Sequence, residues 1–372
     1  MIPEERIRWY LEAVSDSDNE WMISISSDSF IIGRDEDCSL KLIDKWISRR
    51  HSEIRASGDH LWIRDLGSTN GTIVNHKIIE QAELLENGDI ISIGKFTFQV
   101  KRAESSAMDA VETCAMNLSE HINQLALFEP KFQELLRERK VLPHYQPVIR
   151  FSDMKVVGYE VLGRVADEGL PTSISELFDM AEWIGCASDL SSLFREVGVE
   201  IGRNLPGEPL LFVNTCPSEI YEISTLLASM KIISKLAPLN KIVLEINEKA
   251  ATSTSEMSRL RAALGHLNIG MAFDDFGAGQ TRLVELAKVP PDFLKFDISL
   301  IRQIHLAPQR LQQMVTTFIK AAQDLGISTL AEGVECCNEA QTCQKLGFDY
   351  VQGFFYGRPA PFSEITAANT AR

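Results

Sequence analysis

The chain of 372 residues lacks long hydrophobic runs: no stretch of about 18 apolar residues occurs, so no membrane-spanning helix is predicted. The N-terminal sequence MIPEERIRWY lacks the basic start and apolar core of a signal peptide. Only seven cysteines are present, an odd number without a CxxC pair, which argues against a disulfide framework and a zinc site. These absences predict a cytoplasmic protein with reduced thiols.

Basic residues are too few for broad capture of nucleic acid. The chain has 37 Lys and Arg against 52 Asp and Glu, a net charge of −15 at pH 7. Such an excess of acidic groups repels the phosphate backbone of a duplex. A DNA or RNA duplex is therefore not expected as a partner, whereas a small phosphorylated ligand held by a metal or a few basic groups remains compatible.

The residues that are present divide the chain into segments of different pattern. Short β-branched and aromatic segments separated by turns predict an all-β sandwich with strands at 9–14, 20–26, 29–34, 39–43, 51–56, 60–66, 72–75, 89–94 and 96–101. Apolar residues at helical intervals predict a linker helix over 103–128. From 130 to 362, apolar strands alternate with amphipathic helices, which predicts a (β/α)₈ barrel of the TIM type. We therefore expect a multi-domain protein with boundaries 1–102, 103–129 and 130–372.

Four short motifs stand out in the first segment: Gly33-Arg34, Ser48-Arg49-Arg50-His51, the 67–72 stretch GSTNGT, and 87–89. Singly, each has an ordinary explanation: an exposed arginine, a hydrogen-bonded core histidine, a hairpin turn. Together they offer a guanidinium, hydroxyls and an amide, which suit a phosphate held in one orientation.

In this order and spacing the motifs resemble those of the forkhead-associated (FHA) domain. The resemblance implies an eleven-stranded β-sandwich that recognises phosphothreonine in a partner protein or peptide. The residues matched by position are Arg34, Ser48 and Thr69 at the phosphate, Arg49 beside it, Asn70 on the peptide backbone, and Gly33 and His51 in the loops.

A polar residue ends each predicted barrel strand: Glu160, Asn214, Glu245, Asp274 with Asp275, Lys295, Glu332 and Gln352. The carboxyl ends of barrel strands meet at one mouth, where clustered carboxylates would repel one another and raise their pKa values. Divalent cations would relieve this repulsion, and all-oxygen ligands favour Mg²⁺ or Mn²⁺ over zinc. A lone Glu after a strand is usually a solvated charge, and a lone Lys an ordinary ion-pair partner, but seven polar strand ends in register are harder to explain in this way.

These motifs resemble the EAL domain family of cyclic di-GMP phosphodiesterases. They read YQP at 145–147, EVLGR at 160–164, FVN at 212–214, LEINE at 244–248, DDFGAG at 274–279, KFD at 295–297, AEGVE at 331–335 and QGF at 352–354. The resemblance implies a TIM-like barrel that opens cyclic di-GMP to linear pGpG with two Mg²⁺ or Mn²⁺ ions. Calcium is expected to inhibit, because it accepts more ligands at longer distances.

The same resemblance implies roles for individual residues. Glu160, Asn214, Glu245, Asp274 and Asp275 would bind metal. Lys295 would orient or help deprotonate the attacking water, Glu332 and Gln352 would complete the site, and Glu248 would brace the loop after Asp275. The substrate-binding set is Gln146, Arg164, Asp297 and Glu335.

Two positions depart from the family pattern. Val161 replaces the Ala of the family name, and 278–282 reads AGQTR where the family commonly has TGYSS. That loop leads to the helix through which many members dimerise, so the resemblance allows a homodimer through the EAL domain, while the change leaves the turnover rate and the dimer coupling open. A cyclase motif of the GGDEF type is absent from the sequence, which excludes synthesis of the nucleotide.

The leading hypothesis is a phosphodiesterase recruited or regulated through phosphothreonine recognition. One alternative is a catalytically silent cyclic di-GMP receptor or scaffold. Another is a phosphodiesterase whose main substrate is pGpG or a different cyclic dinucleotide.

Overall fold

The computed structural model describes residues 8–13, 21–25, 29–35, 37–42, 46–57, 60–75, 77–94, 96–103, 128–165, 169–220, 222–247, 254–278 and 283–370. The contacts divide the chain into two compact units, one containing residues up to 133 with 175–186, and one containing the remainder. Most of the predicted linker helix, 104–127, lies outside the described residues, and the three predicted domain boundaries remain predictions.

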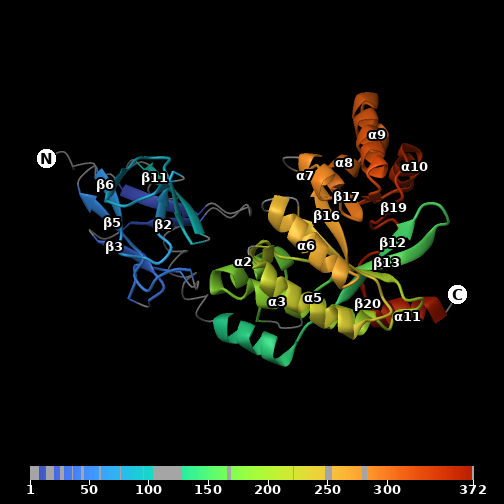
Figure 1. Cartoon of the computed structure of the whole chain (residues 1–372), viewed down its shortest axis with the longest axis horizontal. Coiled ribbons are helices and arrows are strands. Elements are labelled where there is room, and N and C mark those ends of the chain that lie inside the picture. Colours follow the sequence, from blue (N-terminus) through green and yellow to red (C-terminus); the bar gives the residue numbers. More distant parts are fainter. Residues whose placement is uncertain are drawn as a thin grey trace. The chain divides into compact units, whose positions relative to one another are not determined.

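The first unit is a sandwich of two β-sheets (blue to cyan in Figure 1). The six-stranded sheet has the order β2 (Trp21–Ser24), β1 (Arg8–Ala13), β11 (Phe96–Ala103), β10 (Ile90–Ile93), β7 (Thr72–Val74) and β8 (Lys77–Ile78). The five-stranded sheet has the order β4 (Leu40–Lys41), β3 (Phe30–Gly33), β5 (Ser52–Ser57), β6 (His60–Asp65) and β9 (Glu83–Leu85). The predicted sandwich is therefore confirmed.

Alternation of buried and exposed side chains joins the two sheets into one core. In β6 the exposed His60 and Trp62 alternate with the buried Leu61 and Ile63. These inward residues belong to one apolar cluster that contains side chains from both sheets. All nine predicted strands occur, whereas β8 and β9 were missed because they are two or three residues long and mostly exposed, so they carry no alternation.

The second unit is an eight-stranded barrel. Seven parallel strands follow in order: β13 (Lys155–Leu162), β14 (Leu210–Asn214), β15 (Ile242–Asn247), β16 (Gly270–Phe276), β17 (Phe293–Phe296), β18 (Ser328–Ala331) and β19 (Tyr350–Val351). The eighth strand, β12 (His144–Arg150), pairs with both β19 and β13 and so closes the ring, while β20 (Ala360–Pro361) lies alongside β12. The predicted TIM-like barrel is confirmed.

Strand β12 departs from the all-parallel arrangement that alternating strands and helices predict. It runs antiparallel to β13 and β19 because a tight turn at 151–154, rather than a helix, connects β12 to β13. The βα pattern used for the prediction carries no signal for such a hairpin.

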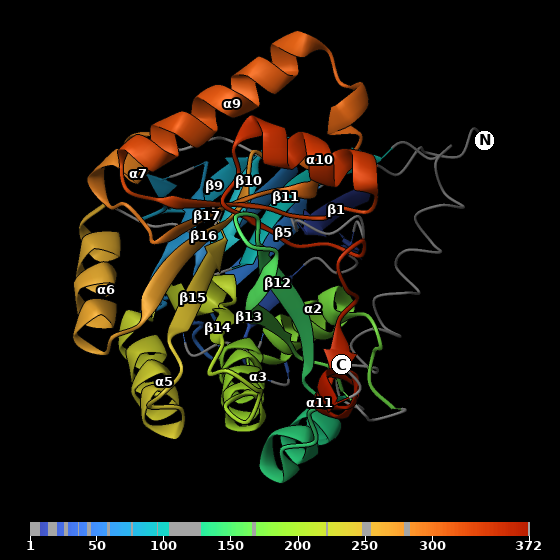
Figure 2. The same cartoon turned by 90° about the vertical axis from the view of Figure 1, so that its right-hand side faces the viewer.

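Helices cover the outside of the barrel, as Figure 2 shows for α5, α6 and α9. Their bounds are α2 (Ile174–Ile184), α3 (Ala187–Gly202), α4 (Pro217–Ile220), α5 (Ile223–Leu236), α6 (Thr254–His266), α7 (Leu283–Lys288), α8 (Ile298–Ile301), η3 (Ile304–Leu306), α9 (Gln309–Asp324), α10 (Cys337–Leu346) and α11 (Phe362–Thr370). The outward strand residues pack with helix residues in one large core. A separate inner cluster consists of Val148, Phe212, Val243, Ala272, Phe293 and Leu330.

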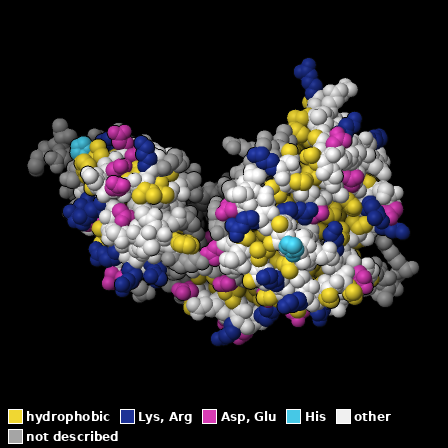
Figure 3. Space-filling model, viewed as in Figure 1, with side chains coloured by type: hydrophobic (Ala, Val, Ile, Leu, Met, Phe, Trp, Pro, Cys, Tyr) yellow, Lys and Arg dark blue, Asp and Glu magenta, His cyan; other side chains and the backbone are white. Residues whose placement is uncertain are grey.

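Among the helices of the described segments, none is both long and apolar enough to cross a membrane. Acidic and basic side chains are intermixed over the face of the molecule drawn in Figure 3. The net negative charge is therefore not gathered into a single patch on that face.

Because β13 packs closely against β14, we expect a methyl group added at Gly158 to destabilise the protein and a methyl group added at the open position Gly265 not to do so. A Cβ at Gly158 would lie 2.8 Å from both the Cβ and the carbonyl oxygen of Leu210. We expect Gly158→Ala to lower the free energy of unfolding by about 1–3 kcal/mol. Gly265→Ala, in an exposed position of α6 with no heavy atom within 4 Å, should leave it unchanged or raise it by up to about 1 kcal/mol. Equal urea midpoints for the two variants would contradict this packing.

Candidate functional sites

The polar residues of the barrel mouth lie one layer above its apolar interior. Each follows an inner apolar residue by two positions: Asn214 after Phe212, Glu245 after Val243, Asp274 after Ala272, Lys295 after Phe293, and Glu332 after Leu330. Side chains two apart on a strand point to the same face, so all five enter the barrel where the parallel strands end. Gln146 joins this layer from the antiparallel β12, where it precedes the inner Val148.

Lys295 is at the centre of the layer. Its side chain is 1% exposed, and its Nζ is 2.7 Å from Glu245 Oε1, 2.9 Å from Glu332 Oε1 and 3.1 Å from Asp274 Oδ1. The structure thus brings together four of the predicted site residues. One ammonium is shared by three carboxylates.

Glu160 is held by two side-chain amides. Asn214 Nδ2 donates to Glu160 Oε1 at 3.1 Å, and Gln352 Nε2 donates to Glu160 Oε2. Gln352 Nε2 also donates to Gln146 Oε1 at 3.0 Å, and Gln146 Nε2 donates to the Gly357 carbonyl oxygen at 3.1 Å. Both ends of the Gln146 amide are therefore engaged within the protein, and its expected contact with substrate remains a prediction.

Burial is the largest single influence on the pKa values of Glu245, Glu332 and Lys295. Desolvation raises the pKa of Glu245 well above 4.5; the Lys295 ammonium opposes the rise, while Glu160 and Asp274 add to it. The pKa of Glu332 is raised for the same first reason, with Asp274 adding to the rise. Burial alone would lower the pKa of Lys295, but the surrounding carboxylates outweigh it and hold that pKa well above 10.5. In this environment Lys295 is an ammonium.

Asp275 has an unusual backbone for a residue with a side chain. Its φ is +59°, in the left-handed region, and the pairing of β16 with β17 shifts register at this point. Its N–H donates to Asp274 Oδ1 at 3.0 Å, and its Oδ2 accepts from Asn247 Nδ2. Burial first, then the charges of Asp274 and Asp297, raise the pKa of Asp275. This irregularity lets the carboxylates of the adjacent residues Asp274 and Asp275 lie together at the barrel mouth.

The donor set fits divalent cations. Oxygens of Asp274, Asp275 and Glu332 lie within 4.8 Å of one another. Within the described part of the chain, Glu245 Oε2 and Gln352 Oε1 are buried without a hydrogen-bond partner. A buried oxygen without a partner costs free energy that a cation would recover. These hard oxygen ligands suit Mg²⁺ or Mn²⁺.

The remaining predicted residues of the barrel lie around this centre. Arg164 is half-buried, and burial lowers its pKa while the charge of Glu160 opposes that shift. Asp297 caps α8 by accepting the Ser299 N–H at 2.9 Å. Glu335 is exposed, with Oε2 3.6 Å from Arg302 Nη2. Glu248 and the 279–282 part of the unusual loop lie outside the described residues.

A second group of potential ligands, His305, Cys336 and Glu339, lies at the start of α10. Glu339 Oε1 accepts the Gln303 N–H at 2.8 Å, and Oε2 accepts the N–H groups of Glu335 and Cys336 at 2.8 and 3.3 Å. Burial alone would raise the pKa of Glu339, but these backbone bonds outweigh it and lower the pKa. The carboxylate is therefore a helix cap, and we assign it no metal.

In the sandwich, hydrogen bonds join two of the predicted phosphate-binding loops to each other. His51 is fully buried; its Nδ1 accepts the Ser48 N–H at 3.3 Å, so its Nε2 donates to the Gly71 carbonyl oxygen at 3.1 Å. Ser48 Oγ accepts the Thr69 N–H at 3.1 Å. Asn70 Nδ2 donates to the Trp46 carbonyl oxygen at 2.7 Å. The 46–51 and 69–71 segments thus form one surface.

The side chains predicted to contact phosphopeptide are accessible on that surface. Arg34, Arg49, Thr69 and Asn70 are exposed, and Ser48 is partly exposed. The Arg34 N–H donates to the Ser48 carbonyl oxygen at 3.1 Å, which places the glycine-arginine motif against the same loop. A Cβ at Gly33 would lie 2.3 Å from the Arg49 carbonyl oxygen, so this approach requires glycine.

Two family models match the chain. The model described as EAL domain matches residues 129–359, and the model described as FHA domain matches residues 30–94. The first match covers more than half of the chain, so the chain belongs to the EAL domain family, with an FHA domain preceding the EAL domain.

Individual relatives share the barrel. The probable cyclic di-GMP phosphodiesterase PdeN of Escherichia coli K12 is 28% identical over 227 residues, which cover 59% of this chain and 44% of PdeN. The cyclic di-GMP phosphodiesterase RocR of Pseudomonas aeruginosa is 28% identical over 59% of this chain and 57% of RocR. The chain thus spans about half the length of these curated relatives. The solved structure of Klebsiella pneumoniae BlrP1 with manganese and cyclic di-GMP matches at 26% identity and a TM-score of 0.52, covering 60% of this chain and 56% of BlrP1.

Sequence reasoning missed several residues that support the mouth. Asn247 contacts Asp275, and Thr215 Oγ1 donates to the Glu245 carbonyl oxygen at 2.8 Å. Asn247 lies within the 244–248 motif and Thr215 directly follows Asn214, and these are the signals that the sequence offers. Arg195 and Glu219, described below, have no such signal.

The raised pKa values of Glu245 and Glu332 predict how stability depends on pH. Because the folded state binds protons more readily than the unfolded state, metal-free protein should lose stability as pH rises above about 4.5 toward the raised pKa values. Mn²⁺ competes with these protons, so it should raise the melting temperature more at pH 8 than at pH 5.

The matched comparison for this prediction is Glu332→Gln against Glu364→Gln, which alters an exposed carboxylate in α11. Relative to the parent, metal-free Glu332→Gln should gain stability between pH 5 and pH 8, whereas Glu364→Gln should not. Parallel pH profiles for the parent and both variants in thermal unfolding would contradict the prediction.

Proposed function

We propose that the barrel hydrolyses cyclic di-GMP to linear pGpG with two Mg²⁺ or Mn²⁺ ions. The observation that carries this proposal is the layer of carboxylates around Lys295, directly above the apolar interior of the barrel. The names of the relatives supply the substrate: RocR is a cyclic di-GMP phosphodiesterase, and BlrP1 was solved with manganese and this nucleotide. Each of these matches covers about three fifths of the chain, and the EAL domain model matches residues 129–359, where this layer lies.

The proposed roles follow the positions in the layer. Glu160, Asn214, Glu245 and Asp274 hold metal, and Asp275 completes the set for a second ion. Bound divalent ions polarise the phosphate oxygens and make a coordinated water more acidic. Lys295, whose ammonium contacts Glu245, Asp274 and Glu332, would orient the attacking water.

Other residues bind and enclose the substrate in this proposal. Arg164, beside Glu160, is the cation available for a phosphate oxygen. Asp297, Glu335 and Gln146 line or support the nucleotide site, and Gln352 fixes the orientation of Glu160. Glu248 braces the loop after Asp275. Calcium inhibits because it takes more ligands at longer distances than Mg²⁺ and so disturbs the in-line geometry.

We further propose that the sandwich binds a phosphothreonine peptide and thereby recruits or regulates the barrel. Support comes from the exposed Arg49 and Thr69 on loops that His51 and Asn70 join, and from the exposed Arg34, whose N–H donates to the Ser48 carbonyl oxygen. A phosphate carries about −1.5 to −2 charge, so a basic surface on an otherwise acidic protein selects for it. Measuring the rate of hydrolysis with and without saturating phosphopeptide separates regulation from recruitment.

The proposed hydrolysis is tested at Glu160. In Mg²⁺, Glu160→Ala should lower the rate of pGpG formation at least about 100-fold, because it removes a charged metal ligand worth several kcal/mol at the transition state. The control is Asp153→Ala, which breaks an exposed ion pair with Arg150 and a hydrogen bond from the Lys155 N–H in the β12–β13 turn, and which should keep the parent rate. A parent protein that binds cyclic di-GMP without forming pGpG would instead support the receptor hypothesis.

The proposed peptide recognition is tested at Arg34. Arg34→Ala should weaken binding of a phosphothreonine peptide by about 2 kcal/mol, roughly 30-fold in Kd, because a charge-assisted contact to the phosphate is lost. Arg55→Ala, which removes an exposed arginine paired with Glu53 on β5, is the matched control and should bind as the parent does. Equal affinity for peptides with and without phosphate, measured by calorimetry, would refute the assignment.

A further inference from the structure

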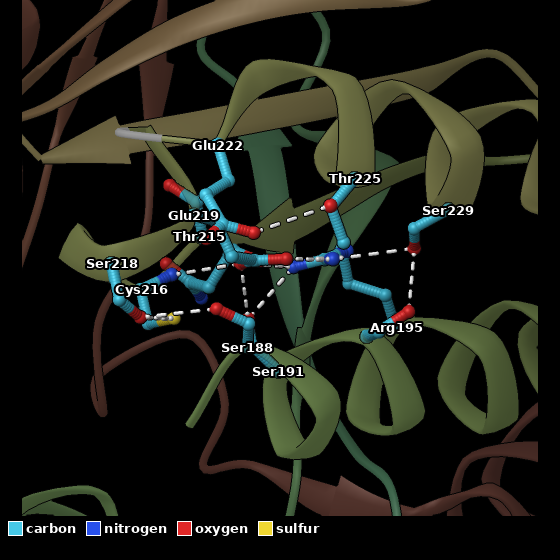
Figure 4. A network of polar contacts seen from close by, with 12 residues as sticks. Ser188, Ser191, Arg195, Thr215, Cys216, Ser218, Glu219, Glu222, Thr225 and Ser229 are labelled. Atoms are coloured by element: carbon cyan, nitrogen blue, oxygen red, sulfur yellow. Dashed lines mark hydrogen bonds and ion pairs between the residues drawn. The ribbon is translucent and has the colours of Figure 1, made fainter. Parts of the chain in front are cut away.

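A buried ion pair lies behind the strand ends that carry Asn214 and Glu245. Figure 4 shows Arg195 of α3 and Glu219 of α4 pointing toward each other. The side chains are 2% and 1% exposed. Arg195 Nη1 donates to Glu219 Oε2 at 2.7 Å and Arg195 Nη2 donates to Glu219 Oε1, so the contact is bidentate.

Hydroxyl groups complete the network. Ser191 Oγ accepts from Arg195 Nη1 at 2.7 Å and donates to Glu219 Oε2 at 2.7 Å. Ser229 Oγ of α5 accepts from Arg195 Nη2 at 3.2 Å (Figure 4). Three helices are thereby joined. A buried ion pair of this kind is often no more stabilising than well-packed apolar residues, so stability alone does not explain it.

Both members of the pair bind the backbone of the loop that follows β14. Arg195 Nη1 donates to the Asn214 carbonyl oxygen at 3.0 Å, and Glu219 Oε2 accepts the Cys216 N–H at 3.1 Å. The ion pair therefore holds the chain on either side of Thr215.

Thr215 itself binds the neighbouring strand. Its N–H and its Oγ1 both donate to the Glu245 carbonyl oxygen, at 3.2 and 2.8 Å. Asn214 and Glu245 are direct neighbours in the parallel register of β14 and β15. The 214–216 segment is thus fixed at three consecutive residues, and the side chain of Asn214 reaches Glu160 at 3.1 Å.

We propose that Arg195, Glu219 and Thr215 are positioning residues for the divalent metal site: they set the direction of the Asn214 amide and of the Glu245 carboxylate. This inference rests on the proposed function, because it assumes that Asn214 and Glu245 hold metal. The three residues themselves touch neither metal nor nucleotide. Groups that orient metal ligands typically change metal affinity by about 10- to 100-fold when they are replaced.

The first test compares Thr215→Val with Thr215→Ser in the full chain without nucleotide. Mn²⁺ is titrated and its affinity measured by calorimetry and by the loss of the free-Mn²⁺ electron paramagnetic resonance signal. Thr215→Ser keeps the hydroxyl and should bind within about twofold of the parent, whereas Thr215→Val should bind about tenfold more weakly. Equal affinity for Thr215→Val and the parent would overturn the role of Thr215.

Thr329→Val is the matched control. Thr329 is fully buried in β18, and its Oγ1 donates to Asp349 Oδ2 at 2.9 Å, away from the segment that holds Asn214. This variant should lower the melting temperature yet keep the Mn²⁺ affinity. A loss of affinity equal to that of Thr215→Val would show that any buried hydroxyl of the barrel matters, which would overturn the specific role.

The second test removes the ion pair as a unit. Arg195→Met with Glu219→Leu leaves no uncompensated buried charge, so the double variant should fold with a melting temperature near that of the parent. Its Mn²⁺ affinity should fall about 10- to 100-fold. Unchanged affinity at unchanged stability would overturn the positioning role of the pair, while the proposed function would stand. Failure of the parent to bind Mn²⁺ would overturn the proposed function and this inference together.

Discussion

Mutual repulsion among buried carboxylates is the constraint on which the barrel mouth depends. Among the described residues, three carboxylates contact the ammonium of Lys295, and Glu160 and Asp275 lie beside them. The strand geometry forces this proximity, since every second residue of a strand points into the barrel. Burial together with the neighbouring negative charges raises the pKa values of Glu245, Glu332 and Asp275, so protons or cations bind readily at the mouth. The arrangement of carboxylates at the mouth therefore favours the binding of positive charge over the stability of the metal-free fold.

Neutral side-chain amides orient two of these carboxylates, Glu160 and Asp275. Glu160 is fixed by amides and Asp275 by Asn247, so neither depends on Lys295 for orientation. Amide donors hold a carboxylate in place without cancelling its charge, which leaves that charge available to a cation. Behind the strands, the Arg195–Glu219 pair acts on backbone rather than on ligand side chains. The carboxylates thus retain their negative charge at the mouth, while an ion pair outside the mouth holds the backbone of the 214–216 segment.

The sequence predicts structural features that recur along the chain, such as the βα units. It does not predict features that depend on a single contact. The strand-end residues could be found because βα units recur along the chain, and the structure places Asn214 and Lys295 in one layer, with Glu160 hydrogen-bonded to Asn214. The antiparallel direction of strand β12 could not be predicted, because the hairpin that joins β12 to β13 interrupts the repeated βα units. Arg195 and Glu219 occupy ordinary polar positions on helices, and only the fold shows that both are buried. In the sandwich the structure brings together the loops of three of the four motifs, whereas 87–89 bonds to β11 residues instead.

The antiparallel closing strand has a consequence for the order in which the barrel mouth is assembled. Strand β12 is paired with β13 along its length but with β19 through only two residue pairs, Ile149 with Val351 and Arg150 with Tyr350. Gln352, the next residue, is bonded to Glu160 across 192 positions of sequence. A contact of such long range forms late, because the intervening chain must first be ordered. During synthesis, Glu160 therefore leaves the ribosome long before the residue that fixes it. A nascent barrel that ends before Gln352 would carry the acids of the mouth without the closing amide.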